Sequence, residues 1–281
     1  MKILITGASG LVGQALVPFL TAEGHTVVRL VRDVPMDYEG FDAVIHLAGE
    51  NIAAKRWTPA QKQKIRDSRV NFTQLLSTAL AECKKPPKVL ISASAIGIYG
   101  NRNTEILTEE SAIGQDYLSD VCRDWEAATQ PARDKGIRVV NMRFGLILTP
   151  KGGALAKLLP PFQFGVGGPL GSGKQFMSWI AIDDVIGAIH HALATESLTG
   201  PVNTVSPNPV TNAAFSRTLG RVLFRPWFAP VPAFAVKLLF GEMGEALLLS
   251  STNVQPQKLL ASGYVFRHPD LENALRFLLT T

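Results

Sequence analysis

The chain has 281 residues, of which 46% are hydrophobic, and this apolar content suffices for one large domain or for one domain with a small appendage. Its formal net charge of +5 comes without a basic run typical of a nucleic-acid-binding tail, so we expect no nucleic-acid partner. The two cysteines, Cys83 and Cys122, are not spaced as a metal-binding pair, which indicates a reduced, cytoplasmic protein with no disulfide framework and no metal site.

The first thirty residues predict one β-α-β unit. Residues 2–6 form an apolar strand that begins at the N-terminus, so we expect no signal peptide before it. Residues 11–23 carry apolar side chains at helical spacing, and Gly24 can adopt the left-handed conformation that ends a helix. Residues 25–31 then form a second strand.

Glycines occupy three positions of the first turn. Gly7 permits the tight turn out of the strand, Gly10 lets backbone N–H groups approach a pyrophosphate, and Gly13 lets the helix pack closely on the sheet. The N-terminus of the helix also favours negative charge. This context predicts a dinucleotide site, although a tight turn that binds nothing has the same spacing. The cofactor contacts that we predict here are Gly7, Ser9, Gly10, Leu11 and Val12.

The end of the second strand indicates which dinucleotide is bound. An acidic residue there usually binds the ribose 2′-hydroxyl of NAD, whereas an arginine binds the 2′-phosphate of NADP. The strand runs into Val31 and Arg32, and the guanidinium of Arg32 can form a fork with a phosphate. Asp33 would favour NAD, and Arg32 would otherwise be a solvated loop residue, but the pattern favours NADP, with Val31 and Arg32 as contacts.

Residues 41–49 form an apolar third strand, as expected for a parallel strand covered on both faces. Its last residues, Leu47, Ala48 and Gly49, are small enough to leave room for a ligand across the sheet edge, and we predict that they contact the cofactor. His46 is expected to be a packed strand residue. Glu50 and Asn51 follow where the crevice should open, or they cap the next element.

A long helix over 58–83 follows, with Thr58 as its N-cap and Pro59 in its first turn. Its basic side is typical of a solvated face, but Arg69 could reach back to the cofactor phosphates, and we include it among the cofactor contacts. Residues 89–94 form the fourth strand.

Several motifs at this point resemble the extended short-chain dehydrogenase/reductase family. They are TGASGLVG at 6–13, HLAG at 46–49, SAS at 92–94 and IYG at 98–100. Five further motifs resemble one atypical branch, the NADP-binding "epimerase family protein" group, whose C-terminal segment is a domain of unknown function. They are LAGENI at 47–52, DSR at 67–69, CRDWEA at 122–127, GGPLGSG at 167–173 and WI at 179–180.

The resemblance implies a catalytic Ser/Thr, a Tyr, and a Lys four residues after the Tyr. Ser94 matches the Ser/Thr position. The Tyr-x-x-x-Lys pair should lie on the helix that begins near 116, but Tyr117 is followed four residues later by Val121. An alignment on Glu126 places Leu118 and Cys122 at the Tyr and Lys positions instead.

No lysine therefore supports a tyrosine, and an ordinary reductase mechanism is not expected. Tyr99 could supply a hydroxyl or could form a wall of the pocket, and we assign Ser94 and Tyr99 as the candidate catalytic residues. The resemblance also implies that Ser92 and the backbone near Leu146 lie along the cofactor.

The rest of the chain alternates strands and helices and then becomes helical. We expect a helix ending at 158–161 and Asp183–Asp184 capping a helix over 185–194. The glycine-rich run at 164–174 is either a surface loop or a lid over the crevice. The remaining predicted elements are strands at 137–143, 176–182 and 201–205 and helices at 212–223, 233–250, 255–262 and 271–279. The apolar stretch 222–240 contains Arg225, Lys237 and three prolines, so it is a poor membrane span.

The sequence thus predicts an α/β fold: a Rossmann-type, doubly wound parallel sheet with a small, mostly helical C-terminal lobe. Residues 1–150, joined by about 175–205, would form the NADP-binding domain, and 151–281 the substrate-side lobe. Two functions are compatible with it. One is an NADP-dependent oxidoreductase or epimerase-like enzyme acting on a small molecule, and the other is an NADPH-binding sensor without turnover. A homodimer is left open.

Overall fold

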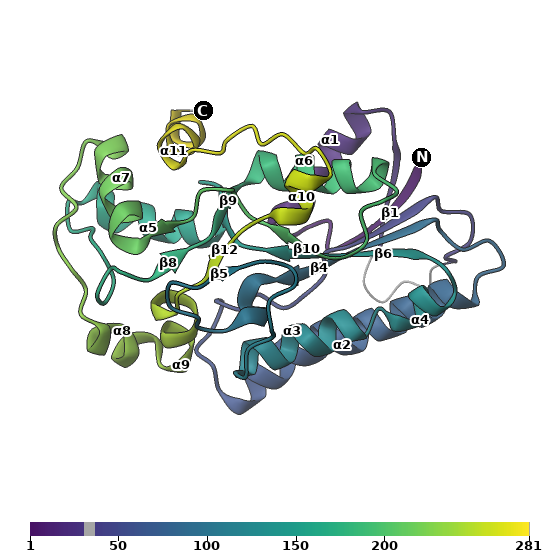
Figure 1. Cartoon of the computed structure of the whole chain (residues 1–281), viewed down its shortest axis with the longest axis horizontal. Coiled ribbons are helices and arrows are strands. Elements are labelled where there is room, and N and C mark those ends of the chain that lie inside the picture. Colours follow the sequence, from purple (N-terminus) through teal and green to yellow (C-terminus); the bar gives the residue numbers. More distant parts are fainter. Residues whose placement is uncertain (31–36, 281) are drawn as a thin grey trace.

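The computed structural model describes residues 1–30 and 37–280. The predicted contacts at Val31 and Arg32, and the competing Asp33, lie outside the described residues. The rest of the chain forms an α/β fold with one large central sheet and a lobe at one end of it (Figure 1).

The central sheet has six strands in the order β10-β6-β4-β3-β1-β2, and every neighbouring pair is parallel. The strands are β1 (Lys2–Thr6), β2 (Thr26–Arg29), β3 (Ala43–His46), β4 (Val89–Ala95), β6 (Arg138–Phe144) and β10 (Gly200–Thr204). This arrangement confirms the predicted doubly wound, Rossmann-type sheet. The strand order reverses between β1 and β3, and in such sheets ligands bind outside the carboxyl ends of the strands at this switch point.

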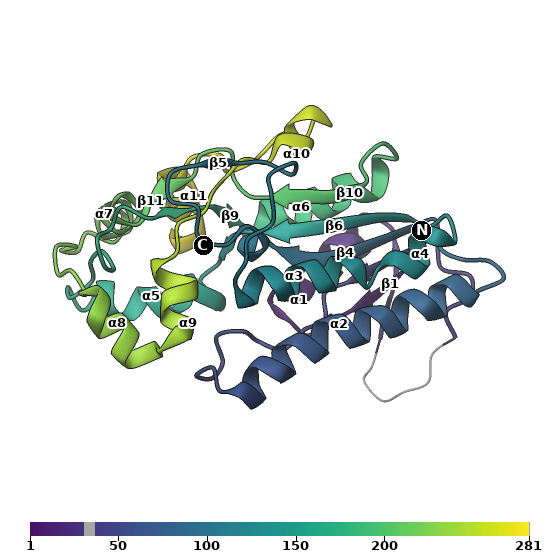
Figure 2. The same cartoon turned by 60° about the horizontal axis from the view of Figure 1, so that its bottom comes forward.

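Helices cover both faces of the sheet (Figure 2). One face carries α1 (Leu11–Ala22) and α6 (Ile182–Ala194), and the other carries α2 (Pro59–Glu82), α3 (Tyr117–Ala127) and α4 (Gln130–Asp134). Thr58 caps α2 as predicted, because its hydroxyl accepts a hydrogen bond from the Gln61 N–H at 3.2 Å.

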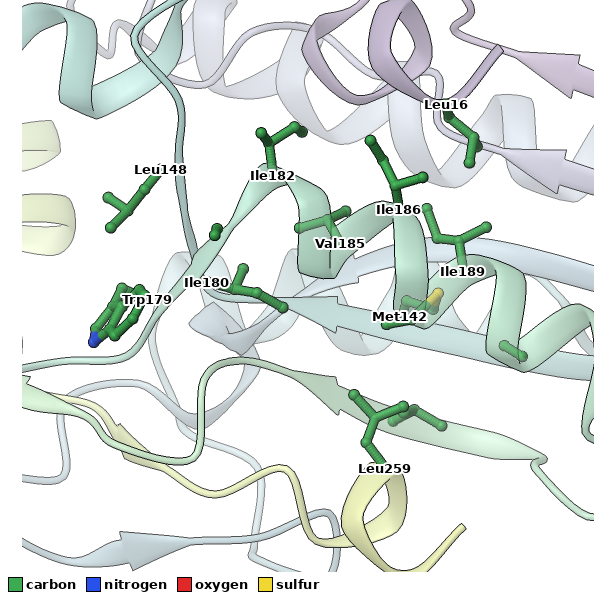
Figure 3. Close-up of a cluster of buried hydrophobic side chains, with 14 of the residues drawn as sticks. Leu16, Met142, Leu148, Trp179, Ile180, Ile182, Val185, Ile186, Ile189 and Leu259 are labelled. Atoms are coloured by element: carbon green, nitrogen blue, oxygen red, sulfur yellow. The ribbon is translucent and has the colours of Figure 1, made fainter. Parts of the chain in front are cut away.

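The larger core lies under α1 and α6 (Figure 3). Val185, Ile186 and Ile189 of α6 pack toward Leu16 of α1 and Met142 of β6, and all five side chains are buried. Helix α6 therefore completes the core of the sheet, although it follows a segment of the lobe in the sequence.

The lobe gathers beyond the carboxyl ends of the strands (Figure 1). Its helical elements are α5 (Gly153–Gln163), α7 (Asn212–Leu223), α8 (Ala233–Phe240), α9 (Glu242–Gly244) and the π-helix η2 (Glu245–Leu249). Two more helices, α10 (Gln257–Ala261) and α11 (Leu271–Thr280), pack against β10 and α7 respectively.

Short elements connect these parts. They are the 3-10 helix η1 (Ile96–Tyr99) and the strands β5 (Ile106–Leu107), β7 (Leu146–Leu148), β8 (Phe176–Met177), β9 (Trp179–Ala181), β11 (Val210–Thr211) and β12 (Asn253–Val254). They form three two-stranded sheets, β12 with β5, β7 with β9, and β11 with β8. Among the described residues, no helix has the length and apolar character that crossing a bilayer requires.

Two expectations about helix boundaries were wrong. Helix α5 continues through Pro160 and Pro161 to Gln163 instead of ending at the prolines. The single helix predicted over 233–250 is broken at Gly241, whose φ of +60° lies in the left-handed region and ends α8.

The predicted cap at Asp183–Asp184 was also wrong, because α6 begins earlier, with Ala181 at its N-cap position and no side-chain cap. Asp184 is fully buried, and its carboxylate accepts hydrogen bonds from the backbone N–H groups of Arg267 and His268 at 2.7 and 2.9 Å and from the Tyr264 hydroxyl at 3.1 Å. This carboxylate therefore ties the C-terminal segment to the helix that closes the core.

The glycine-rich run at 164–174 is a loop that packs part of its backbone against the lobe, while Phe164 and Val166 stay exposed. Whether it acts as a lid stays a prediction. A Cβ on Gly168 would lie 2.2 Å from the carbonyl oxygen of Ala229. Gly171 N–H donates to the Val231 carbonyl at 2.8 Å, and Val231 N–H donates to the Pro169 carbonyl at 2.9 Å. The glycines serve close backbone contact here, which composition alone did not distinguish from flexibility.

Candidate functional site

The turn after β1 interlocks with the end of β3. Gly7 has a φ of +71°, and a Cβ on it would lie 2.6 Å from the carbonyl carbon of Leu47. A Cβ on Gly13 would lie 2.4 Å from the Gly7 carbonyl oxygen. Only glycine fits at either position, because real Cβ atoms do not approach backbone so closely. The predicted contacts Gly7 and Leu47 thus lie side by side at the switch point.

The N-terminus of α1 presents backbone without a side-chain cap. Gly10 is the N-cap residue, its N–H donates to the Gly7 carbonyl at 3.0 Å, and the first turn contains no acidic residue. The next N–H groups, at Leu11 and Val12, have no partner within the helix. Such a terminus suits an anion. The Ser9 carbonyl accepts a hydrogen bond from the Gln14 side chain at 2.8 Å, which holds the turn in place.

Gly49 and Arg69 lie against each other on the other side of the switch point. A Cβ on Gly49 would lie 3.3 Å from the Arg69 Cζ, so glycine leaves room for the guanidinium. Arg69 Nη1 donates to the Ile65 carbonyl at 3.1 Å, and its Cζ lies 5.1 Å from the centroid of the Trp125 ring.

No carboxylate of the described residues forms an ion pair with Arg69. Desolvation lowers the pKa of its guanidinium, and the nearby Glu50 carboxylate only partly offsets this effect. A half-buried arginine without an ion pair, held against the backbone at Gly49, is a suitable partner for a phosphate.

The side chains of Ser92 and Leu146 lie away from the wall formed by Gly49 and Arg69. Ser92 is fully buried within β4, where its Oγ lies 3.4 Å from the Ala93 carbonyl oxygen. Leu146 is half-buried in β7, opposite Trp179 of β9. Their assignment as cofactor contacts stays a prediction.

Ser94 belongs to a buried, charged network. Its hydroxyl donates to Glu126 Oε1 at 2.6 Å. Glu126 is held by two hydrogen bonds from the guanidinium of Arg143, at 2.8 Å from Nε and 2.9 Å from Nη2. The carboxylate raises the pKa of Arg143, which burial alone would lower. Ser94 is only 2% exposed, so its hydroxyl proton is committed to the carboxylate.

Tyr99 belongs to the same network and is fully buried. Its hydroxyl donates to Asn203 Oδ1 at 2.6 Å and accepts from Arg143 Nη1 at 2.9 Å. Burial raises the pKa of Tyr99 despite the nearby guanidinium. This placement favours a structural role for Tyr99 over the catalytic role that the sequence suggested.

The helix positions that resemble the missing Tyr and Lys carry apolar or inert groups. Cys122 is buried, and burial raises the pKa of its thiol to about 12, so it is no nucleophile at neutral pH. Tyr117 donates to the Lys62 carbonyl at 2.8 Å, and burial raises the pKa of its hydroxyl. Tyr117 and Leu118 line a pocket of about 270 Å³ between the sheet domain and η2, together with Trp57.

His46 is a packed strand residue, as expected. Its Nδ1 lies 2.6 Å from Thr6 Oγ1 and its Nε2 lies 2.8 Å from Thr73 Oγ1, which also accepts from Trp125 Nε1 at 3.0 Å. Burial lowers the pKa of His46 from 6.5 to about 4. The imidazole is therefore neutral in the folded protein at physiological pH.

This shift predicts a stability that depends on pH. In the unfolded chain His46 takes up a proton near pH 6.5, whereas the folded protein resists protonation down to about pH 4. The contribution is complete above pH 6.5 and is lost as the pH falls toward 4, by about 3 kcal/mol in all. Urea unfolding of the wild type and of His46→Asn over this range measures it. Parallel pH profiles for the two proteins would contradict the assignment.

Sequence reasoning missed the residues that hold this site together. Asn203 lies on β10, and its Oδ1 accepts a hydrogen bond from the Tyr99 hydroxyl. The backbone N–H of Asn203 donates to Glu109 Oε1 at 3.0 Å. Tyr99 and Glu109 lie 104 and 94 residues from Asn203 in the chain, so spacing gives no signal for these contacts. Arg143 ended a predicted apolar strand, and a charge at such a position was the one available hint of a buried ion pair.

Two family models match the chain. The "NAD dependent epimerase/dehydratase family" matches residues 3–204, and "Domain of unknown function (DUF1731)" matches residues 231–278.

Similar proteins cover almost the whole chain. An epimerase family protein of Mycobacterium bovis is 41% identical over 99% of this chain and 97% of its own length. The crystal structure of human epimerase family protein SDR39U1 with NADPH matches with a TM-score of 0.95 and 34% identity, over 100% of both chains. A structure named as the nucleoside-diphosphate sugar epimerase from Corynebacterium glutamicum matches with a TM-score of 0.82 and 37% identity, over 99% of this chain and 58% of that one.

Proposed function

The chain belongs to the NAD dependent epimerase/dehydratase family, and from this premise we propose that it binds NADP(H) and acts as an oxidoreductase or nucleotide-sugar-epimerase-like enzyme on a small molecule. The observation that carries the proposal is the interlocked glycine turn, together with a half-buried arginine, Arg69, that forms no ion pair with a described residue. A pyrophosphate over this turn would accept hydrogen bonds from the free N–H groups of α1, because the N-terminus of a helix favours an anion.

The residues fit a dinucleotide on two counts. The close contact of Gly7 with the Leu47 backbone admits glycine alone at this turn, as the tight first turn of a dinucleotide site requires. Arg69 would place a positive charge close to a phosphate from the wall formed by Ala48 and Gly49, where no carboxylate of the described residues forms an ion pair with it. Ser9, Gly10, Leu11 and Val12 would bind through the backbone of the turn and helix start.

NADP is favoured over NAD by two independent supports. The human relative named above was crystallised with NADPH. Arg32 follows the second strand, where an arginine accommodates the 2′-phosphate. When bound, the nicotinamide would supply hydride transfer to or from a carbon centre.

The chain offers fewer candidate groups for proton transfer and substrate orientation than an ordinary reductase does. Ser94 is the candidate closest in type to a substrate-orienting hydroxyl, and it could still accept a hydrogen bond while donating to Glu126. In the described residues, no lysine ammonium hydrogen-bonds to the hydroxyl of Tyr99 or Tyr117. The Lys62 ammonium lies over the Tyr117 ring instead, 4.3 Å from its centroid. The name of the Corynebacterium protein supports a nucleotide-sugar substrate, but this chain spans little more than half of that protein.

A second candidate function is NADPH binding without turnover, as a sensor. It is supported by the commitment of the Ser94 and Tyr99 hydroxyls to buried partners and by Cys122 at the lysine position. Consumption of NADPH in the presence of one member of a carbonyl or sugar-nucleotide panel would establish the enzyme. Tight binding with no consumption across the panel would establish the sensor.

The cofactor preference gives the direct test of the proposal. We expect NADPH to bind more tightly than NADH, and Arg32→Ala to remove most of the difference, because a fork of charged hydrogen bonds to a phosphate is worth roughly 10- to 100-fold in affinity. Titration of both cofactors by calorimetry measures this. Equal affinities of the wild type for NADPH and NADH would defeat the assignment, and Arg29→Ala, at the exposed end of β2, is the matched control.

A further inference from the structure

The outer surface of the lobe has a basic concavity that the proposed cofactor site does not use. It lies between the C-terminal end of α7 and α11 and has a volume of about 430 Å³, which is within the range of small-molecule sites. None of its lining residues belongs to the glycine turn or to the wall beside Arg69. The lining residues that matter here are Arg217, Arg221, Phe224, Arg225, Trp227 and Arg276.

Four arginines surround this concavity, and one carboxylate offsets them. The Glu272 carboxylate accepts hydrogen bonds from Arg221 Nη1 at 3.0 Å and from Arg276 Nη2 at 2.7 Å. These hydrogen bonds, first that of Arg276 and then that of Arg221, lower the pKa of Glu272, so the carboxylate is ionised and is shared by two cations. The cluster keeps a positive charge that a single glutamate does not balance.

The other two arginines have no carboxylate partner among the described residues. Arg225 donates only to a backbone carbonyl, that of Gln163, at 3.1 Å, and Arg217 has no ion pair there. Guanidinium groups present donors in a planar fork that matches phosphate oxygens. Several such groups converging on one concavity repel each other, and a phosphate would relieve that repulsion.

Two aromatic side chains lie beside the arginines. Phe224 ends α7 in the left-handed region, with a φ of +54°, and its side chain is 82% exposed. Trp227 packs on α7 at Gly220, where a Cβ would lie 2.6 Å from the Trp227 Cβ. The left-handed conformation of Phe224 ends the helix and leaves its large aromatic ring exposed beside the arginines, where it could cover a ligand with an apolar or aromatic part.

We propose that this concavity is a second ligand site, which binds a phosphate group carried on an aromatic or apolar moiety. The phosphate would be held by Arg217 and Arg225, the two arginines without a carboxylate, while Glu272 fixes the other two. Phe224 and Trp227 would cover the moiety. A free phosphate monoester and the headgroup of an anionic lipid share this chemistry, and the experiment separates them.

The test uses the full-length protein with saturating NADPH, so that nucleotide probes are kept out of the crevice. Adenosine 5′-monophosphate, inorganic phosphate and phosphatidylcholine vesicles containing phosphatidic acid are titrated in turn. The variant Arg217→Ala/Arg225→Ala is compared with Arg133→Ala/Lys174→Ala, which removes the same charge from two exposed positions elsewhere. The readout is the difference between these two variants, because binding at any other site is the same in both.

We expect at least one monophosphate or vesicle probe to bind the wild type and the control at least tenfold more tightly than the Arg217→Ala/Arg225→Ala variant. Binding of the nucleotide more tightly than inorganic phosphate supports a soluble ligand, and binding of the vesicles alone supports a headgroup. Equal affinities of the two variants would overturn the proposal. A short single-stranded RNA is titrated as a fourth probe, and its binding without binding of any phosphate probe would also overturn the proposal.

Discussion

Glu126→Ala is expected to lower the free energy of unfolding by about 3–5 kcal/mol, because it leaves the guanidinium of Arg143 buried without its counter-ion. The side chains of Arg143 and Glu126 are only 6% and 13% exposed, and two hydrogen bonds of 2.8 and 2.9 Å join them. The substitution also removes the acceptor of the Ser94 hydroxyl. Urea unfolding at neutral pH, followed by circular dichroism, measures the loss.

The matched control replaces both partners. Because a buried ion pair can often be exchanged for apolar side chains of similar volume at little cost, Glu126→Leu/Arg143→Met is expected to be less destabilised than Glu126→Ala alone. If the double variant loses as much stability as the two single variants together, the ion pair itself contributes little. The contacts of each side chain with its other neighbours, such as the Tyr99 hydroxyl at 2.9 Å from Arg143, would then account for the loss.

Arg69→Met is expected to lower the affinity for NADPH by roughly 10- to 100-fold, the range of a charge-assisted hydrogen bond to an anion. Without cofactor, the same variant should be about as stable as the wild type or more stable, because it removes a partly desolvated charge that forms no ion pair with a described residue. Calorimetric titration and thermal unfolding with and without NADPH give both quantities. The opposite signs of the two effects distinguish a ligand-binding arginine from a structural one.

Arg66→Met is the control, one turn earlier on the same helix. Arg66 is 40% exposed and pairs with Asp124 at 2.9 Å, so its loss should change neither the affinity nor the stability by much. A loss of unliganded stability in Arg69→Met with unchanged affinity would contradict the role proposed for Arg69. The contact of its guanidinium with Trp125 would then be its whole contribution.

Features of the fold that depend on neighbouring residues, such as turns, helix caps and strands, could be predicted from the sequence. The glycine spacing at 7, 10 and 13 placed the first turn correctly, and Thr58 capped α2 where it was expected. The apolar runs predicted the strands of the parallel sheet, although β3 is shorter than the run that contains it, because Leu47 leaves the strand to meet Gly7.

The rest depended on contacts between distant parts of the chain. The carboxylate of Asp184 looked like a helix cap, since acidic residues are common there, yet its partners come from residues 264–268. Ser94 and Tyr99 carried the right groups for catalysis, but only the folded chain shows that Glu126 and Asn203 already engage their hydroxyls. Spacing predicts which groups can reach a site and leaves open which partner each group takes.

The link between Asp184 and the C-terminal segment sets the order in which the chain can finish folding during synthesis. Helix α6 buries this carboxylate, whose donors include Arg267 and His268, so a nascent chain that ends before them would carry a desolvated, unsatisfied acid in its largest core. Ribosome-bound chains shorter than this point should therefore stay open to proteases along α6. Release of the last residues would close the molecule in one late, cooperative step.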